Sequence, residues 1–190
     1  GVPVPTGVGP TAVLTDPTGR FAYVTSKGAT PATTPGIVSF YTINAATGAL
    51  TLVNTVPTGK HPKSITLDGT ATYAWVANLV DSSVSSYRIN GDGSLTALGT
   101  VATATSPETV IILTDQSTGG VLTNKYAYVT ASGGTIWRHT IPSNGALQTG
   151  TNAEVLAGTN APSLRVISQK ITGQGDRRAY VVNAAANEIQ

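Results

Sequence analysis

The chain contains no cysteine, and only 11% of its 190 residues are charged. The lack of cysteine excludes disulfides, a thiolate zinc site and a cysteine nucleophile. The longest basic run is the pair Arg177-Arg178, which is too short for the phosphate neutralisation that nucleic-acid binding requires. No apolar run approaches the length of about 18 residues that a membrane-spanning helix needs. We therefore expect no nucleic-acid partner and no membrane span.

Threonine is abundant and occurs 31 times. Its β-branched side chain packs well on a half-buried pleated surface, so the composition favours strands. Low charge with abundant Thr, Ala and Gly predicts a bacterial protein that is extracellular or at the cell surface, with the periplasm as an alternative. The chain begins at Gly1 without Met and without a signal-peptide pattern, so we expect a mature, processed or partial product.

A short phrase with a central aromatic residue returns four times along the chain. The aromatic residues are 52 or 53 positions apart, and they are Tyr23, Trp75, Tyr128 and Tyr180. A fixed period of this length indicates a repeat architecture.

Each repeat predicts four strands. The first follows a proline, is short and almost entirely apolar or Thr, and is expected to be buried on both faces; its copies are 11–14, 64–67, 109–113 and 164–167. The second contains the aromatic residue. The third covers 37–43, 84–89 and 135–141 in the first three repeats. The fourth begins at 49, 94 and 146, after a glycine-containing turn.

Four antiparallel strands joined by tight turns and repeated in phase predict an all-β fold, a β-propeller of four-stranded antiparallel blades. A β-sandwich or an elongated β-array is the alternative. We expect the last strand of a preceding blade at 1–7, blades at 8–57, 58–102 and 103–157, and a partial blade at 158–190. These three and a half blades are expected to belong to a longer propeller. The alternative is a four-bladed ring in which the first strand closes the last blade.

Several segments resemble the YVTN-type repeat, namely 16–25, 39–52, 62–69 and 73–78. The pattern is similar to that of the seven-bladed lactonase-like propellers, whose members include 6-phosphogluconolactonases and fungal muconate-cycloisomerising relatives. The resemblance covers essentially the whole chain. It implies a seven-bladed propeller, of which about half would be missing here. It also implies binding sites around the mouth of the central channel, where the loops before the first strands meet those between the second and third strands.

The candidate catalytic residues at this mouth are His61, Glu108 and Arg165. A lactone hydrolase needs a base or a metal to activate water, and a cation or donor to hold the oxyanion. His61 or Glu108 is the candidate base, and Lys63 or Arg165 is the candidate cation. The resemblance implies His, Glu and Arg at this mouth, and only the residue types match here. The alternative for His61 and Glu108 is a solvated loop residue.

The candidate ligand-binding residues lie in the same loops, and they are Lys27, Lys60, Lys63, Asn78, Ser163 and Asn183. Lys63, Glu108 and Ser163 each follow a repeat proline, so we expect them at equivalent positions in adjacent blades. Lys63 and Glu108 could also form a simple surface ion pair, worth at most about 1 kcal/mol.

No Asp-x-Asp cluster or converging set of histidines is present, so we expect no metal and no cofactor. His139 is expected to be a partly buried strand residue with a hydrogen-bond partner. Asp92, between two glycines, is expected to serve a hairpin turn.

Three functions stay open from the sequence. A charge-poor, Thr-rich surface favours a binding or scaffold module that holds a protein or glycan at the channel mouth. A lactone hydrolase acting on a small lactone is the first alternative. The second is a self-assembling structural protein that associates through unpaired strands at its ends.

Overall fold

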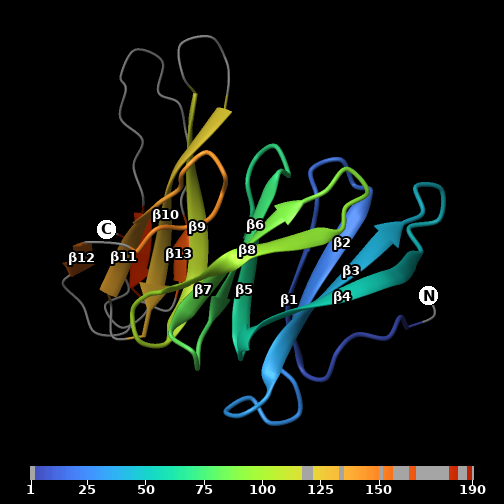
Figure 1. Cartoon of the computed structure of the whole chain (residues 1–190), viewed down its shortest axis with the longest axis horizontal. Helices are drawn as coiled ribbons and strands as arrows, with labels where there is room; N and C mark the ends of the chain where they lie inside the picture. Colours follow the sequence, from blue (N-terminus) through green and yellow to red (C-terminus); the bar gives the residue numbers. More distant parts are fainter. Residues whose placement is uncertain are drawn as a thin grey trace.

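A computed structural model of the chain describes residues 3–116, 122–132, 135–149, 152–155, 163–165, 180–183 and 188–189. These residues form strands and turns and contain no helix, and the sheets stand side by side (Figure 1). The all-β prediction is therefore confirmed. No helix that is long and apolar enough to cross a membrane occurs in the described ranges.

The first three sheets each contain four antiparallel strands that pair in chain order. The first sheet consists of β1 (Pro10–Thr15), β2 (Phe21–Ser26), β3 (Pro35–Ile43) and β4 (Leu50–Lys60). The second consists of β5 (Pro62–Leu67), β6 (Tyr73–Asn78), β7 (Ser83–Ile89) and β8 (Leu95–Ala102). The third consists of β9 (Pro107–Gln116), β10 (Leu122–Ala131), β11 (Thr135–Thr140) and β12 (Asn152–Val155). A fourth sheet contains β13 (Ser163–Arg165), β14 (Tyr180–Asn183) and β15 (Glu188–Ile189).

The first strands of the sheets lie next to one another in the order β1, β5, β9, β13, as expected where blades surround an axis. The apolar core lies between the sheets. One cluster joins Tyr23 and Phe40 of the first sheet to Val76 and Tyr87 of the second. Another joins Trp75 of the second sheet to residues of the third. Each buried side chain of this size contributes about 1.5–3 kcal/mol, so neighbouring sheets stabilise one another. The prediction of propeller blades is confirmed.

Several details differ from the predicted strands. The first strands are not buried on both faces: Val13 in β1 is 68% exposed. All six residues of β2, which lies between β1 and β3 in its sheet, are buried. The N-terminal residues 3–7 do not form a strand, since no neighbouring strand pairs with them among the described residues. In the third sheet, the outer strand begins at Asn152 rather than near residue 146.

The outer strand β4 continues to Lys60, beyond the predicted blade boundary at residue 57, and Lys60 pairs with Pro35. Strand β9 continues to Gln116, and β10 begins at Leu122. Most residues of the predicted partial blade at 158–190 lie outside the described residues.

A buried aspartate closes the turn between the first and second strands. The Asp16 carboxylate accepts hydrogen bonds from the backbone N–H groups of Thr18, Arg20 and Phe21, and from the Thr18 hydroxyl. Asp68 accepts the same backbone bonds from Thr72 and Tyr73 in the next blade. Aspartate suits this position because its short carboxylate folds back onto the following backbone.

The third strand of each blade anchors the chain that leads into the blade. The Tyr41 hydroxyl donates to the Pro5 carbonyl, and the Tyr87 hydroxyl donates to the Pro57 carbonyl. The equivalent residue in the third sheet is His139, which lies opposite Ala127 as Tyr87 lies opposite Ala74. His139 is fully buried and bonds to Thr103 and to the Gln148 carbonyl. Its predicted strand position with a hydrogen-bond partner is confirmed.

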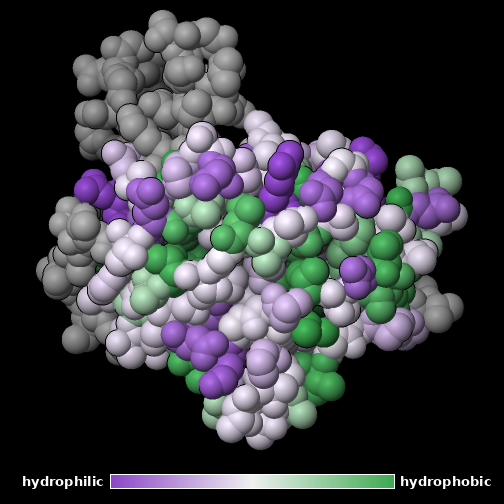
Figure 2. All heavy atoms as spheres, in the orientation of Figure 1, coloured by the Kyte–Doolittle hydropathy of each residue, from purple (hydrophilic) through white to green (hydrophobic). Residues whose placement is uncertain are grey.

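Charged groups are few, and they gather where strands are joined. Figure 2 shows hydrophilic side chains along the upper edge of the view and in a second group at the lower left, while pale and hydrophobic side chains fill most of the middle. At one such turn, Asp92 accepts hydrogen bonds from the backbone N–H and the hydroxyl of Ser94, which confirms its predicted hairpin role.

Candidate functional site

The first strands all begin at one edge of the sheets, at Pro10, Pro62 and Pro107, and we call this the proline edge (lower edge of Figure 1). The residue before each proline has a positive φ: 64° at Gly9, 52° at His61 and 56° at Ser106. Such a conformation is uncommon for residues other than glycine, costs about 1–3 kcal/mol and clusters at functional sites. The repeat therefore places a residue with a positive φ directly before each of these three first strands.

A β-bulge follows each of these prolines. In the second sheet, Pro62 lies opposite Asn78 and Ser64 lies opposite Ala77, so Lys63 is the extra residue. By the same register, Glu108 is the extra residue of the third sheet, and Thr11 that of the first. A bulge redirects the side chain of its extra residue and is common beside active sites.

The two bulges bring Lys63 and Glu108 together. Lys63 Nζ lies 3.6 Å from Glu108 Oε2, with side chains 36% and 29% exposed. The predicted equivalence and proximity of these two residues are confirmed. At this exposure the ion pair stabilises the fold by about 1 kcal/mol at most, so its main effect is to hold two charges at the edge.

His61 precedes Lys63 by two residues, and the charges of both members of the pair act on its imidazole. Its backbone carbonyl accepts a hydrogen bond from Leu79 N at 2.9 Å, which holds the strained peptide in place. Burial lowers the pKa of His61 below its ordinary value, and the nearby ammonium groups of Lys63 and Lys27 lower it further, while Glu108 opposes them. The imidazole is therefore neutral at pH 7 and can accept a proton.

Lys27 completes the cluster from the loop after β2. Its backbone N–H donates to the Gly9 carbonyl at 3.0 Å. A Cβ on Gly9 would lie 2.9 Å from the Lys27 side chain, so glycine at this position leaves room for the lysine. We call Lys27, His61, Lys63 and Glu108 the edge cluster. It combines a neutral imidazole, two ammonium groups and one carboxylate.

The other predicted site residues lie elsewhere. Lys60 is paired with Asp81: its backbone N–H donates to Oδ2 at 2.7 Å, and its Nζ lies 3.8 Å from Oδ1. Asn78 is fully buried within its blade. Its Oδ1 accepts from the Thr58 hydroxyl at 2.9 Å, and its Nδ2 donates to the hydroxyls of Ser83 and Ser85.

Three predicted residues belong to the fourth sheet, where the side chains lie outside the described residues. Ser163 lies opposite Val182 in the backbone register, as Ser64 lies opposite Ala77, so it does not share the position of Lys63. That part of the predicted equivalence is wrong, by one residue. Arg165 lies opposite Tyr180, within β13 rather than before it. Asn183 ends β14 as Asn78 ends β6.

No group of three or more Asp, Glu or His side chains that could hold a metal ion occurs in the described part of the chain. The edge cluster offers one carboxylate and one imidazole as possible metal ligands, which is not a complete ligand set. Its side chains are suited to proton transfer and to the stabilisation of an anion.

A family model described as lactonase, 7-bladed β-propeller, matches residues 3–111 and 26–165 of the chain. Because these matches cover most of the sequence, the chain belongs to this family, and the resemblance of its repeats is confirmed. No curated protein matches the chain.

Solved structures share the fold. A candidate 6-phosphogluconolactonase from Bacteroides fragilis has a TM-score of 0.68 at 18% identity, over 95% of this chain and 49% of that chain. The periplasmic gluconolactonase of Pseudomonas aeruginosa has a TM-score of 0.66 at 16% identity, over 95% and 48%. Hydrazine synthase of Kuenenia stuttgartiensis has a TM-score of 0.62 at 17% identity, over 100% and 50%. The chain thus spans about half the length of these structures, and at these identities the likeness shows the fold alone.

Proposed function

We propose that the chain is part of a lactone hydrolase whose reacting groups are the edge cluster. The observation that carries this proposal is the neutral imidazole of His61, on which the charges of the Lys63–Glu108 ion pair act, in a propeller of the lactonase family. The gluconolactonase among the similar structures adds support for a sugar-derived lactone as substrate.

In this mechanism, His61 accepts a proton from a water molecule, and the water oxygen attacks the lactone carbonyl carbon. Lys63 and Lys27 stabilise the negative charge that develops on the carbonyl oxygen. The carbon–oxygen bond of the ring then breaks, and the imidazolium returns its proton to the ring oxygen. One lactone and one water give one hydroxycarboxylic acid.

Glu108 has two effects in this scheme. Its carboxylate holds the Lys63 ammonium group through the 3.6 Å ion pair. It also favours the protonated form of His61, which raises the pKa of the imidazole toward the value a general base needs near neutral pH. Its removal should therefore lower activity less than the removal of His61.

The family match supports this function over the binding or scaffold role that composition alone favours. The low charge and high Thr content still support our proposal that the protein acts outside the cytoplasm. A hydrolase in that location would meet lactones formed from extracellular sugars.

The test is proton release from δ-gluconolactone by the folded chain, measured above the buffer rate. His61→Gln should lower kcat/KM by about 10²-fold or more, the usual contribution of a general base. Arg20→Gln is the control, because Arg20 lies at the β1–β2 turn, at the opposite end of its sheet. Turnover that is unchanged by His61→Gln would contradict the role of His61, and no turnover by the folded propeller that contains these residues would contradict the function.

A further inference from the structure

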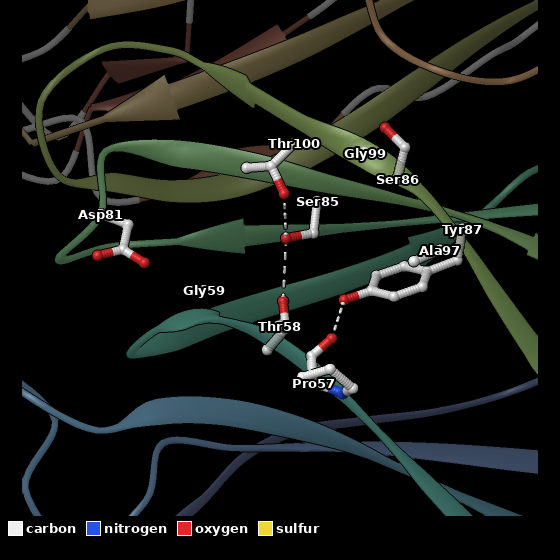
Figure 3. A pocket seen from close by; sticks show the side chains of 10 residues that line it. All are labelled: Pro57, Thr58, Gly59, Asp81, Ser85, Ser86, Tyr87, Ala97, Gly99 and Thr100. Atoms are coloured by element: carbon white, nitrogen blue, oxygen red, sulfur yellow. Dashed lines mark hydrogen bonds between the residues drawn. The ribbon is translucent and has the colours of Figure 1, made fainter.

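A groove of about 290 Å³ lies between the outer strand β4 of the first blade and strands β7 and β8 of the second. No side chain of the edge cluster lines it. Figure 3 shows it from close by, with Asp81 at one end and the ring of Tyr87 at the other. The groove is therefore a second candidate site with its own set of residues.

Small side chains create this space. Ser85 faces β4 and lies opposite Val76, at the position that Trp137 occupies in the third sheet and Ser39 in the first. The Ser86 hydroxyl accepts a hydrogen bond from Leu147 N–H on the other face, so only the backbone of Ser86 borders the groove. Ala97 and Gly99 form the outer wall. A Cβ added to Gly99 would meet nothing within 4 Å, so open space extends along this strand. A residue as large as Trp137 at the Ser85 position would fill this space.

The polar groups in the groove are hydroxyls. The Thr58 and Ser85 hydroxyls lie 3.2 Å apart, and Ser85 lies 3.3 Å from the hydroxyl of Thr100, so three hydroxyls line up across it (Figure 3). Thr58 and Ser85 are buried and also bond to the Asn78 amide. Thr100 is exposed at the rim. The Thr100 hydroxyl can both donate and accept, which matches the hydroxyls of a polyol.

Charge narrows the class of ligand. The groove-lining residues include one carboxylate, Asp81, and no Lys, Arg or His. The carboxylate is already paired with Lys60 at 3.8 Å. Without a free cation the groove does not suit an anion, whereas a carboxylate acceptor beside hydroxyls suits a neutral ligand rich in O–H donors.

We propose that this groove binds a neutral sugar unit. Its volume lies at the lower end of the range for small-molecule sites, which favours a single ring. The unit can come from a free monosaccharide or from one residue of a longer glycan. This proposal does not depend on the lactone hydrolase function, because the two sites share no residue.

The experiment is saturation-transfer NMR and calorimetry on the folded chain with D-glucose, D-galactose and D-mannose, and with the trisaccharides maltotriose and mannotriose. Binding in the millimolar range is expected for a ligand with so few heavy atoms. Tighter binding of a trisaccharide than of its monosaccharide would identify a glycan as the source. Equal binding would identify a free sugar.

Two variants locate the site. Ala97→Phe fills the groove and should abolish binding. Thr100→Val removes only the rim hydroxyl and should weaken binding at least 5-fold. This variant tests the site if Ala97→Phe does not fold. Thr55→Val is the matched control, since Thr55 is an exposed residue of β4 that does not line the groove. His61→Gln should leave sugar binding unchanged.

The proposal is overturned if none of the five sugars gives saturation transfer at 10 mM, about ten times a Kd of about 1 mM. It is also overturned if binding persists unchanged in Thr100→Val, because the sugar then contacts another surface.

Discussion

The hydroxyl of Tyr23 donates a hydrogen bond of 2.7 Å to the backbone carbonyl of Gly93, which belongs to the next blade. Trp75 repeats this relationship with Gly145 through its indole Nε1, at 3.0 Å. Tyr23 and Trp75 are fully buried. Loss of either donor would leave a buried carbonyl without a hydrogen-bond partner. The desolvation penalty of such a group exceeds the net stabilisation that the hydrogen bond provides. These bonds join neighbouring blades in addition to their apolar packing.

Tyr23→Phe should lower the free energy of unfolding by about 1–3 kcal/mol, because it deprives Gly93 of its donor and keeps the ring. Urea denaturation measures the change. Tyr73→Phe is the control: its hydroxyl also donates across blades, to the Ser143 carbonyl, but at an exposed position where water replaces it. Its cost should stay within about 0.5 kcal/mol. Equal losses of unfolding free energy in the two variants would show that the buried bond contributes no more than the exposed one.

A second prediction concerns the turn that accepts this bond. Gly93 has a φ of +85°, and a Cβ there would lie 2.7 Å from the ring of Phe21. Gly48 occupies the corresponding turn of the first sheet with a φ of +69°, and its Cβ would meet nothing within 4 Å. Alanine at either position costs about 1–2 kcal/mol for the left-handed backbone.

Gly93→Ala should therefore cost about 1–3 kcal/mol more than Gly48→Ala, because the Phe21 ring must also move. Thermal and urea unfolding of both variants gives the difference directly. If Gly48→Ala proves as harmful as Gly93→Ala, the contact between turn and ring is not what restricts this position.

The third prediction concerns acid stability. Burial by itself raises the pKa of Asp16, but hydrogen bonds from the Thr18 hydroxyl and from the backbone N–H groups of Phe21, Thr18 and Arg20 outweigh it and lower the pKa below 3.8. Because the folded-state pKa lies below the unfolded-state value, the stabilisation is present above that value. It is lost as the pH falls through the folded-state pKa.

Asp16→Asn should lower the free energy of unfolding at pH 7 by about 1–3 kcal/mol and should flatten the loss of stability below pH 4. Thr18→Val keeps the carboxylate and removes one donor, so it should show an intermediate effect. Unfolding measured between pH 7 and pH 2 tests both. An Asp16→Asn curve parallel to that of the original chain would contradict the lowered pKa.

The fourth prediction concerns His61, one of only two histidines in the chain. Burial is the first cause of its lowered pKa, and Lys63 adds to the lowering while Glu108 opposes it. Lys63→Gln should therefore raise the pKa of His61, and Glu108→Gln should lower it. NMR titration of the imidazole C–H signals measures both, with His61→Gln to assign the resonance.

The acid limb of kcat/KM should shift in the same directions, to higher pH in Lys63→Gln and to lower pH in Glu108→Gln. A pKa that does not respond to either substitution would show that the charges do not act on the imidazole.

The sequence predicted much of the fold, because four in-phase copies of a phrase 52 or 53 residues apart leave few alternatives. It also predicted the meeting of Lys63 and Glu108, since a proline before each first strand marks the same position in adjacent blades. The shift of Ser163 by one residue shows the limit of this argument. A proline marks the start of a strand, but the pairing register determines which side chain follows it.

Two features of the site depend on packing that the repeat pattern does not encode. Asn78 ends its strand at the predicted mouth, yet three hydroxyls from the two strands β4 and β7 hold its amide in the interior. One sequence feature could have indicated that Asn78 is buried, namely the phrase Val-Pro-Thr-Gly at 4–7 and 56–59. Its glycine at position 59 packs so closely against Asn78 that a Cβ there would have no room. The positive φ of His61 could not be predicted, since a non-glycine residue adopts it only where its surroundings require it.

The extra residue of each bulge has a consequence for how such proteins diversify. Thr11, Lys63 and Glu108 stand outside the regular ladder of backbone hydrogen bonds, so exchanging one for another leaves strand register intact. A propeller can thus acquire a hydroxyl, an ammonium or a carboxylate at its proline edge one blade at a time. New side-chain chemistry can arise in this way by single substitutions, without any redesign of the architecture that supports it.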